Sequence, residues 1–312
     1  VAREWLTTIH SAKTTEGHSE RTRIRMEQDL FPWIGRRPIG EIDAPELLAC
    51  LRRVEARGAI ETAHRVKNAA GQVLRYGIAT GKCKRDLTAD LRDALAPVQV
   101  KHHAAITDPK RAGELLRAIA SYKGHGVTRA ALQLAPLVFQ RPGELRMAEW
   151  SEIDLDAGLW TIPSERLKRK KQEKASGQTH AVPLASQAVA ILRDLQPLTG
   201  HGRYLFPSLR TGERPMSDAA VLAALRRMGF PKDEMTGHGF RAMARTMLAE
   251  RLGVAESVIE AQLAHAVSDS LGRAYNRTQF LDQRRTMMQT WADYLDRLRK
   301  GGDVVPLREQ VA

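Results

Sequence analysis

The sequence is short of cysteine, of aromatic residues and of acidic residues, and it has no long apolar run. Its 312 residues include two cysteines, Cys50 and Cys83, and neither has a Cys or His neighbour at metal-ligand spacing. This pattern excludes a zinc-finger or disulfide framework and is compatible with a reducing cytoplasm. No apolar stretch is long enough to span a bilayer, and no secretory signal opens the chain. We therefore expect no membrane association.

What the chain has in excess is positive charge. Lys and Arg number 49 against 36 Asp and Glu, so the formal net charge is +13. Such an excess favours a polyanionic partner, with nucleic acid ahead of an anionic membrane surface. A merely basic soluble protein is the plain alternative. The composition, 43% hydrophobic and 27% charged, is typical of a folded protein, and the length allows two domains.

Helical periodicity dominates residues 1–97. Asp43 followed by Pro45 predicts a helix N-terminus, and a second long helix is expected over residues 61–80. Several basic side chains on these helices are candidate contacts to a DNA backbone: Arg21, Arg23, Arg65, Lys67 and Arg75. For any one of them, a solvated surface charge is the ordinary alternative.

The rest of the chain predicts a second, mainly α-helical domain with a small antiparallel β-sheet. Residues 98–108 have no clear period and are expected to form a linker, in which His102 and His103 lack companion ligands and should be solvent-exposed. Two short strands are expected between residues 159 and 184, and Ser217 is expected to cap a helix over residues 218–228. Residues 109–298 form this domain, and residues 299–312 should be a loose tail.

Two basic features precede the most informative stretch. Arg141, followed by Pro142 and Glu144, predicts a helix start at which the arginine could aim at a phosphate, although a surface arginine is commoner. Between the two predicted strands, residues 167–174 are the densest basic run. That run is expected to be a solvated loop or a phosphate contact, and one of its lysines could reach into a site as a proton donor.

The stretch from His238 to Tyr275 holds a candidate catalytic set. His238 and Arg241 are three apart, so on a helix they share one face, and His265 and Tyr275 follow. Two imidazoles, a permanent cation and a phenol suit a phosphodiester that the phenol attacks. Tyr294 also follows His265, but its place in a helix indicates packing.

In this order, Arg141, a hairpin lysine, His238, Arg241, His265 and Tyr275 resemble the tyrosine recombinases. The sequence around these residues is most similar to integrases of prophages and genomic islands, as in "RPGELRMAEWSEID", "HGFRAMARTML" and "QLAHAVSDSLGRAYNR". The resemblance covers residues 109–298, and residues 1–97 resemble more loosely the family's helical, SAM-like core-binding domain. A lone His-x-x-Arg means little, but the ordered set is specific.

The resemblance implies a role for each residue. Tyr275 would attack the scissile phosphate and form a 3′-phosphotyrosine link. Arg141 and Arg241 would hold its non-bridging oxygens, and His238 and His265 would assist proton transfer, one of them as the base for tyrosine.

Two further roles concern the lysines and a carboxylate. Lys168 would protonate the leaving 5′-oxygen, with Lys170 and Lys171 as rivals for that role and otherwise as DNA contacts. Glu144 would orient Arg141 without acting chemically.

The same resemblance implies partners and setting. Double-stranded DNA at attachment core sites would be the substrate of a homotetramer that integrates or excises a prophage or genomic island. An excisionase and a DNA-bending host factor are conceivable helpers; no metal or cofactor is implied. The protein would work in the bacterial cytoplasm at the nucleoid. The apolar stripe of residues 282–300 would pack on its own core or dock on a neighbouring protomer.

Two other functions stay open at this point. A type IB topoisomerase-like enzyme would share the chemistry but act as a monomer, and a catalytically idle relative would only bind DNA. The family usually adds a small N-terminal domain for arm-type sites, which nothing here resembles. Because residue 1 is Val, we expect the chain to be a fragment or a trimmed form.

Overall fold

The computed structural model describes residues 1–99, 103–167, 177–265 and 280–301. These residues form two compact units, one up to residue 99 and one from residue 103 onward. No helix within these ranges combines the length and apolarity that a bilayer crossing needs.

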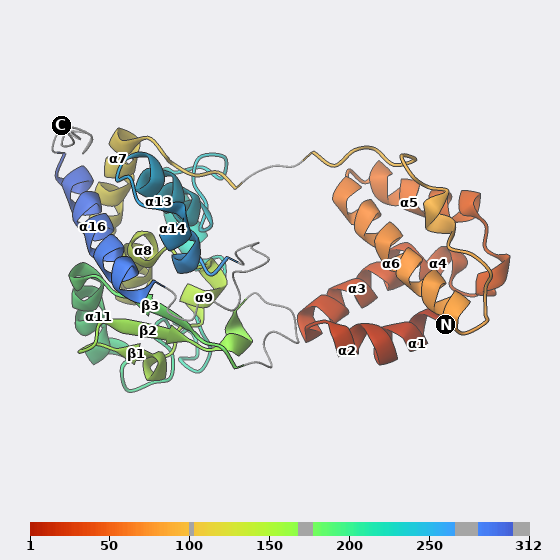
Figure 1. Cartoon of the computed structure of the whole chain (residues 1–312), viewed down its shortest axis with the longest axis horizontal. Helices are drawn as coiled ribbons and strands as arrows, with labels where there is room; N and C mark the ends of the chain where they lie inside the picture. Colours follow the sequence, from red (N-terminus) through yellow and green to blue (C-terminus); the bar gives the residue numbers. More distant parts are fainter. Residues whose placement is uncertain (100–102, 168–176, 266–279, 302–312) are drawn as a thin grey trace. The chain divides into compact units, whose positions relative to one another are not determined.

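The first unit is entirely helical (Figure 1). Its elements are α1 (Ala2–Trp5), the π-helical η1 (Leu6–His10), α2 (Ser11–Lys13), α3 (Glu16–Asp29), α4 (Phe31–Ile34), the 3-10 turn η2 (Ile39–Glu41), α5 (Ala44–Ala56), α6 (Ile60–Ala79) and the 3-10 turn η3 (Leu87–Ala89). Helices α3, α5 and α6 pack on one another around a core that includes Leu51 and Val66.

The predicted start of α5 is confirmed at atomic detail. The Asp43 carboxylate accepts the backbone N–H of Glu46 at 2.8 Å, and the Glu46 carboxylate accepts the backbone N–H of Asp43 at 3.2 Å. This reciprocal capping box satisfies two N–H groups that the first turn of a helix leaves without partners.

The second unit combines helices with a small sheet (Figure 1). Its helices are α7 (Pro109–Ala120), α8 (Gly126–Val138), α9 (Pro142–Arg146), η4 (Trp150–Glu152), η5 (Ser164–Arg166), α11 (Ser186–Thr199), α12 (Ala220–Arg227), α13 (Gly239–Glu250), α14 (Glu256–Gln262) and α16 (Leu281–Lys300). Its strands are β1 (Ile153–Asp154), β2 (Leu159–Ile162) and β3 (His180–Pro183).

The three strands form an antiparallel sheet in the order β1-β2-β3. Trp160 of β2 pairs with Ile153 of β1 and with Val182 of β3, and alternate residues of β2 are buried. The sequence predicted β2 and β3 but not β1, because a two-residue strand carries no periodic signal. The prediction that Ser217 caps a helix was wrong: α12 begins at Ala220, with Ala219 at its N-cap.

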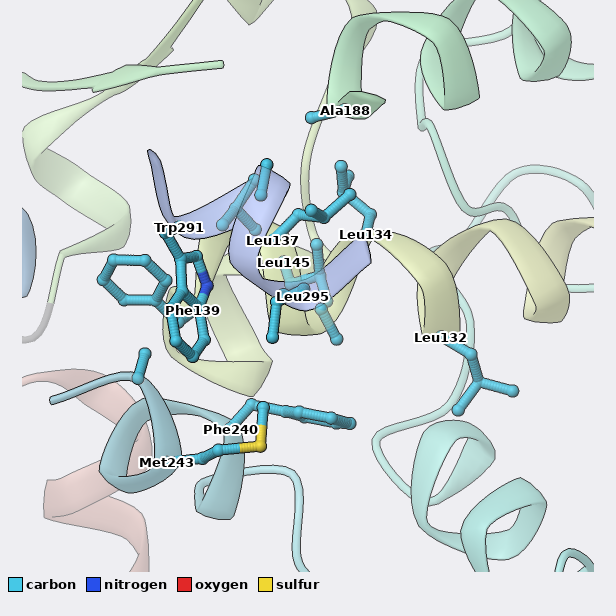
Figure 2. Packing of buried hydrophobic residues seen from close by; sticks show 14 of the residues in the cluster. Leu132, Leu134, Leu137, Phe139, Leu145, Ala188, Phe240, Met243, Trp291 and Leu295 are labelled. Atoms are coloured by element: carbon cyan, nitrogen blue, oxygen red, sulfur yellow. The ribbon is translucent and has the colours of Figure 1, made fainter. Parts of the chain in front are cut away.

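Helix α16 packs into the core of its own unit. Trp291 is fully buried, its indole N–H donates to Pro136 O at 2.8 Å, and the Phe139 ring meets it edge-on at 6.3 Å between centroids. Figure 2 shows Leu295 among the same buried side chains, and α16 also lies along α7. The apolar stripe of residues 282–300 is therefore occupied within this chain. The alternative, that this helix docks on a neighbouring protomer, stays a prediction.

Candidate active site

Arg141 is held by a buried carboxylate. It stands at the N-cap of α9, where its Nη1 donates to Glu144 Oε1 at 2.8 Å and its backbone N–H donates to Glu144 Oε2 at 3.0 Å. The Glu144 side chain is 3% exposed and that of Arg141 is 18% exposed. Charge-assisted bonds at both ends of one residue fix its orientation, so the guanidinium is displayed at the surface in a defined position.

Arg241 connects the ends of two helices. Its Nη1 donates to Phe139 O at 3.0 Å and its Nη2 to Leu263 O at 2.8 Å. Phe139 and Leu263 are the C-cap residues of α8 and α14, where backbone carbonyls lack helical partners and the helix dipole is negative. Arg241 is 8% exposed. Burial, reinforced by the like charge of Arg141, lowers the pKa of Arg241 to about 10, so the side chain is still a cation at neutral pH.

His265 lies between Arg241 and a carboxylate. Arg241 Nη2 is 3.2 Å from His265 Nε2, and His265 Nδ1 is hydrogen-bonded to Glu260 Oε2. Arg245 Nε donates to the other Glu260 oxygen at 2.7 Å. Burial raises the pKa of Glu260, but the hydrogen bonds from Arg245 and His265 outweigh it, and the net pKa of this carboxyl is lowered. The site therefore holds an ionised carboxylate behind the imidazole.

The backbone after α14 makes this contact possible. Ala264 has a φ of +49°, in the left-handed region, and the backbone N–H of His265 donates to Glu260 O at 3.1 Å. The chain therefore reverses within one turn and returns the imidazole toward α14. A left-handed residue at a helix end is a usual way to stop a helix, although glycine adopts it more readily than alanine.

His238 is exposed and precedes α13. Its ring stacks on His103, with centroids 4.5 Å apart and planes 11° apart. The segment after His103 crosses the start of α13 so closely that a Cβ on Gly239 would lie 2.5 Å from Ala104 O, which explains the glycine in this motif. His103 is solvent-exposed as predicted, but the expectation missed this ring contact.

A buried polar network lies beneath His265, and the sequence did not reveal it. Arg284 of α16 is fully buried; its Nε donates to Gln262 Oε1 at 2.8 Å and its Nη2 donates to Ala181 O. Gln262 O in turn contacts Gln140 Nε2 at 3.0 Å and His180 Nε2 at 3.1 Å. The network joins α14, α16, β3 and the residue before Arg141. Burial lowers the pKa of Arg284 to about 10.

Four predicted site residues, Lys168, Lys170, Lys171 and Tyr275, lie outside the described residues. The described chain just before the lysines is anchored: Arg166 pairs with Glu152 and donates to Met147 O. Within the described ranges, no three His, Cys, Asp or Glu side chains gather as they would around a metal ion.

The predicted DNA contacts of the first unit include three arginines paired with carboxylates. Arg23 binds Glu20 and Glu27, Arg65 binds Glu61, and Arg75 binds Asp86. Lys67 donates to Leu91 O at 3.1 Å, and Arg21 is exposed. At least 45% of each of the three paired arginine side chains is exposed, so a phosphate could compete with the carboxylate.

Comparison with known proteins gives matches along almost the whole chain. The family model described as "Phage integrase central domain" matches residues 1–94, and that described as "Phage integrase family" matches residues 106–281. Putative protein IntB of Escherichia coli (strain K12) is 37% identical over 303 residues, which cover 95% of this chain and 76% of that protein. The integrase of Enterobacteria phage P4 is 35% identical over 95% of this chain and 68% of its own length.

Solved structures share the fold. A lambda integrase dimer bound to a COC′ core site has a TM-score of 0.65 at 20% identity, with 85% of this chain and 94% of that chain covered. A lambda integrase tetramer bound to a Holliday junction has a TM-score of 0.63 at 19% identity, with coverage of 87% and 78%. The mainly helical fold with a small antiparallel sheet is thereby confirmed.

Proposed function

The chain belongs to the phage integrase family and is a site-specific recombinase of the tyrosine type, and we propose that it cleaves and rejoins attachment-site DNA through a 3′-phosphotyrosine formed on Tyr275. The observation that carries this proposal is that Arg241 contacts His265 and lies close enough to Arg141 for the charge of Arg141 to lower its pKa, although the three residues come from separate segments. Glu144 and Glu260 offset part of this positive charge, and the guanidinium groups of both arginines can still donate to the non-bridging oxygens of a scissile phosphate.

The arginines stabilise the transition state. As Tyr275 attacks, negative charge grows on the non-bridging oxygens of the phosphate, and Arg141 and Arg241 donate hydrogen bonds to it. Both guanidinium groups are already oriented, one by Glu144 and the other by two helix ends. His238, exposed beside the start of α13, adds a donor to the same phosphate.

A lysine of the segment between β2 and β3 protonates the leaving 5′-oxygen, with Lys168 as the first candidate and Lys170 and Lys171 as rivals. A duplex with sulfur in place of the 5′-bridging oxygen separates them, because a thiolate leaves without a proton. Only the variant that lacks the acid should regain its cleavage rate on this duplex. Rescue of Lys168→Ala supports Lys168, whereas rescue of Lys170→Ala or Lys171→Ala reassigns the role.

Both units bind DNA. Residues 1–97 form a core-binding domain, 98–108 a linker, 109–298 the catalytic domain and 299–312 a tail. The basic residues Arg21, Arg23, Arg65, Lys67 and Arg75 contact backbone phosphates of the core site. The active form on DNA is a homotetramer, as in the lambda integrase tetramer bound to a Holliday junction. An excisionase and a DNA-bending host factor are the expected helpers, and the protein acts at the bacterial nucleoid.

The test is covalent capture on a nicked duplex. Core-site sequences are first selected from random duplexes by binding, and a suicide duplex with a nick near the cleaved bond then traps the enzyme–DNA adduct on a denaturing gel. We expect an adduct with the wild-type chain and none with Tyr275→Phe. A wild-type chain that forms no adduct, or Tyr275→Phe that forms as much, would contradict the proposal.

Strand exchange distinguishes this reading from a relaxing enzyme. The chain should join two different core-site duplexes and pass through a four-way junction. An enzyme that relaxes supercoils but never exchanges strands would instead be topoisomerase-like. An adduct with neither activity would separate cleavage from recombination and contradict the tetramer.

A further inference from the structure

Two histidines from distant parts of the second unit lie face to face. The imidazole of His103 stacks on that of His238, with centroids 4.5 Å apart and planes 11° apart. Both side chains are exposed, so neither ring is confined by a surrounding core. Rings that stack at this separation attract each other beyond the area that they bury. The contact therefore limits the orientations of a side chain that the proposed function places at the scissile phosphate.

The backbone that carries His103 is fixed against the start of α13. Thr236 Oγ1 donates to Ala104 O at 3.2 Å and accepts the backbone N–H of Gly239 at 3.0 Å. His103 directly precedes Ala104, and His238 directly precedes Gly239. One threonine side chain therefore ties together the two backbone segments from which the stacked rings project.

The rest of this segment is anchored as well. Ile106 is 5% exposed and packs in the core of the second unit. The Asp108 carboxylate accepts the backbone N–H of Arg111 at 2.8 Å, at the start of α7. In a mobile segment, the backbone freedom lost on stacking would offset the attraction between the rings. Here that freedom is already lost on folding, so a stack of two exposed rings can persist.

We propose that His103 is a positioning residue that holds the ring of His238 in the orientation for its hydrogen bond to the scissile phosphate. This inference deepens the proposed function and rests on it. Stacking involves the face of the His238 ring, whereas hydrogen bonds form at the nitrogens on its edge, so the two contacts do not compete. An uncharged aromatic face also attracts a cation, so the support persists when His238 is protonated beside a phosphate.

The test replaces the ring of His103 and measures the single-turnover rate of adduct formation on the suicide duplex. We expect His103→Ala to lower this rate by about 3- to 10-fold, the span that one aromatic pair supplies. His103→Phe should restore most of the rate, because a phenyl ring stacks without a charge or a hydrogen bond. The control is His201→Ala, a matched change at another exposed histidine of the same unit, which should match wild type.

A direct role of His103 as a further cation at the phosphate predicts the opposite order of variants. His103→Lys would then cleave faster than His103→Phe, and that order overturns the inference. His103→Ala that cleaves as fast as His201→Ala overturns it too. Duplex affinity and Tm should change little in His103→Ala, because the substitution lies at the surface. A parallel fall in rate, affinity and Tm would show a general structural effect and overturn the positioning role.

A double variant tests whether His103 acts through His238. If it does, His103→Ala combined with His238→Ala should form adduct no more slowly than His238→Ala alone. Additive losses overturn the inference.

Nuclear magnetic resonance of the free chain tests the stack without DNA. His103→Ala should shift the ring-proton signals of His238, because the ring current of the stacked neighbour is lost, whereas His201→Ala should leave them in place. Signals of His238 that do not respond to His103→Ala overturn the inference even if the wild-type chain forms the adduct. A wild-type chain that shows the stack but forms no adduct overturns the proposed function, and the role of the stack with it.

Discussion

The buried Arg284 gives the sharpest prediction about the architecture under the site. Arg284→Met keeps an unbranched apolar stem but removes the donors to Gln262 Oε1 and Ala181 O. Two acceptors then lose their partners, at about 1–3 kcal/mol each. The variant no longer buries a cation, and burial is what lowers the pKa of Arg284 to about 10. Removing the buried cation therefore offsets part of the loss in stability. We expect a net loss of about 2–4 kcal/mol in the free energy of unfolding.

Calorimetry of the full chain measures this loss. For a unit of this size the loss should lower the Tm of the second unit by roughly 5–15 °C. The control is Arg285→Met, the exposed neighbour on the same helix, which should stay within about 0.5 kcal/mol of wild type. Arg284→Met with wild-type stability would refute the reasoning, because burial of the cation would then destabilise the fold by as much as its hydrogen bonds stabilise it. Equal losses in both variants would show that the helix surface, and not the network, is responsible.

Three further predictions concern the site and the DNA-binding face. Arg141→Lys should leave Tm nearly unchanged, because a cation still faces Glu144. It should slow adduct formation about 100-fold, because lysine lacks the guanidinium group that donates two hydrogen bonds to one phosphate. A twofold effect on the rate would contradict this prediction. The folded-state pKa of Glu260 is lowered, so the stability it contributes is present above the ordinary glutamate pKa and is lost as pH falls through the folded-state value. The difference in unfolding free energy between wild type and Glu260→Gln, measured by urea titration, should therefore shrink between about pH 7 and about pH 3, and a constant difference would contradict the assignment. Arg21→Ala should reduce the slope of log affinity against log salt by about one, as seen in duplex-binding titrations, whereas an unchanged slope would remove Arg21 from the backbone contacts.

The sequence predicted most of the helices because their signals are local. The start of α5 could be read from Asp43 and Pro45, and the candidate catalytic residues of the ordered motif could be proposed before their contacts were known. The two-residue strand β1 was missed, since it depends on pairing with β2. Pattern and capping chemistry determine an element, whereas pairing and burial depend on its neighbours in space.

The partners of the site residues could not be predicted in the same way. Glu260 contacts His265 only because Ala264 adopts a left-handed conformation, and an alanine in a sequence does not predict that conformation. Arg284 shares the helical spacing of the buried Met287 and Trp291, so a signal existed, but its charge favoured an exposed position. Stacking of His103 on His238 brings residues 135 positions apart together, and only the tertiary fold does that.

The position of Arg241 between two helix ends has a consequence for how an inactive form of this protein should be made. Its guanidinium loses water when α8 and α14 come together, before any DNA is bound, so phosphate binding need not remove that water again. The same arrangement ties the proposed catalytic role to folding, because replacing Arg241 removes its hydrogen bonds to both helix ends as well as the cation of the candidate site. A trap for intact DNA complexes is therefore better built by changing the nucleophile than by changing this arginine.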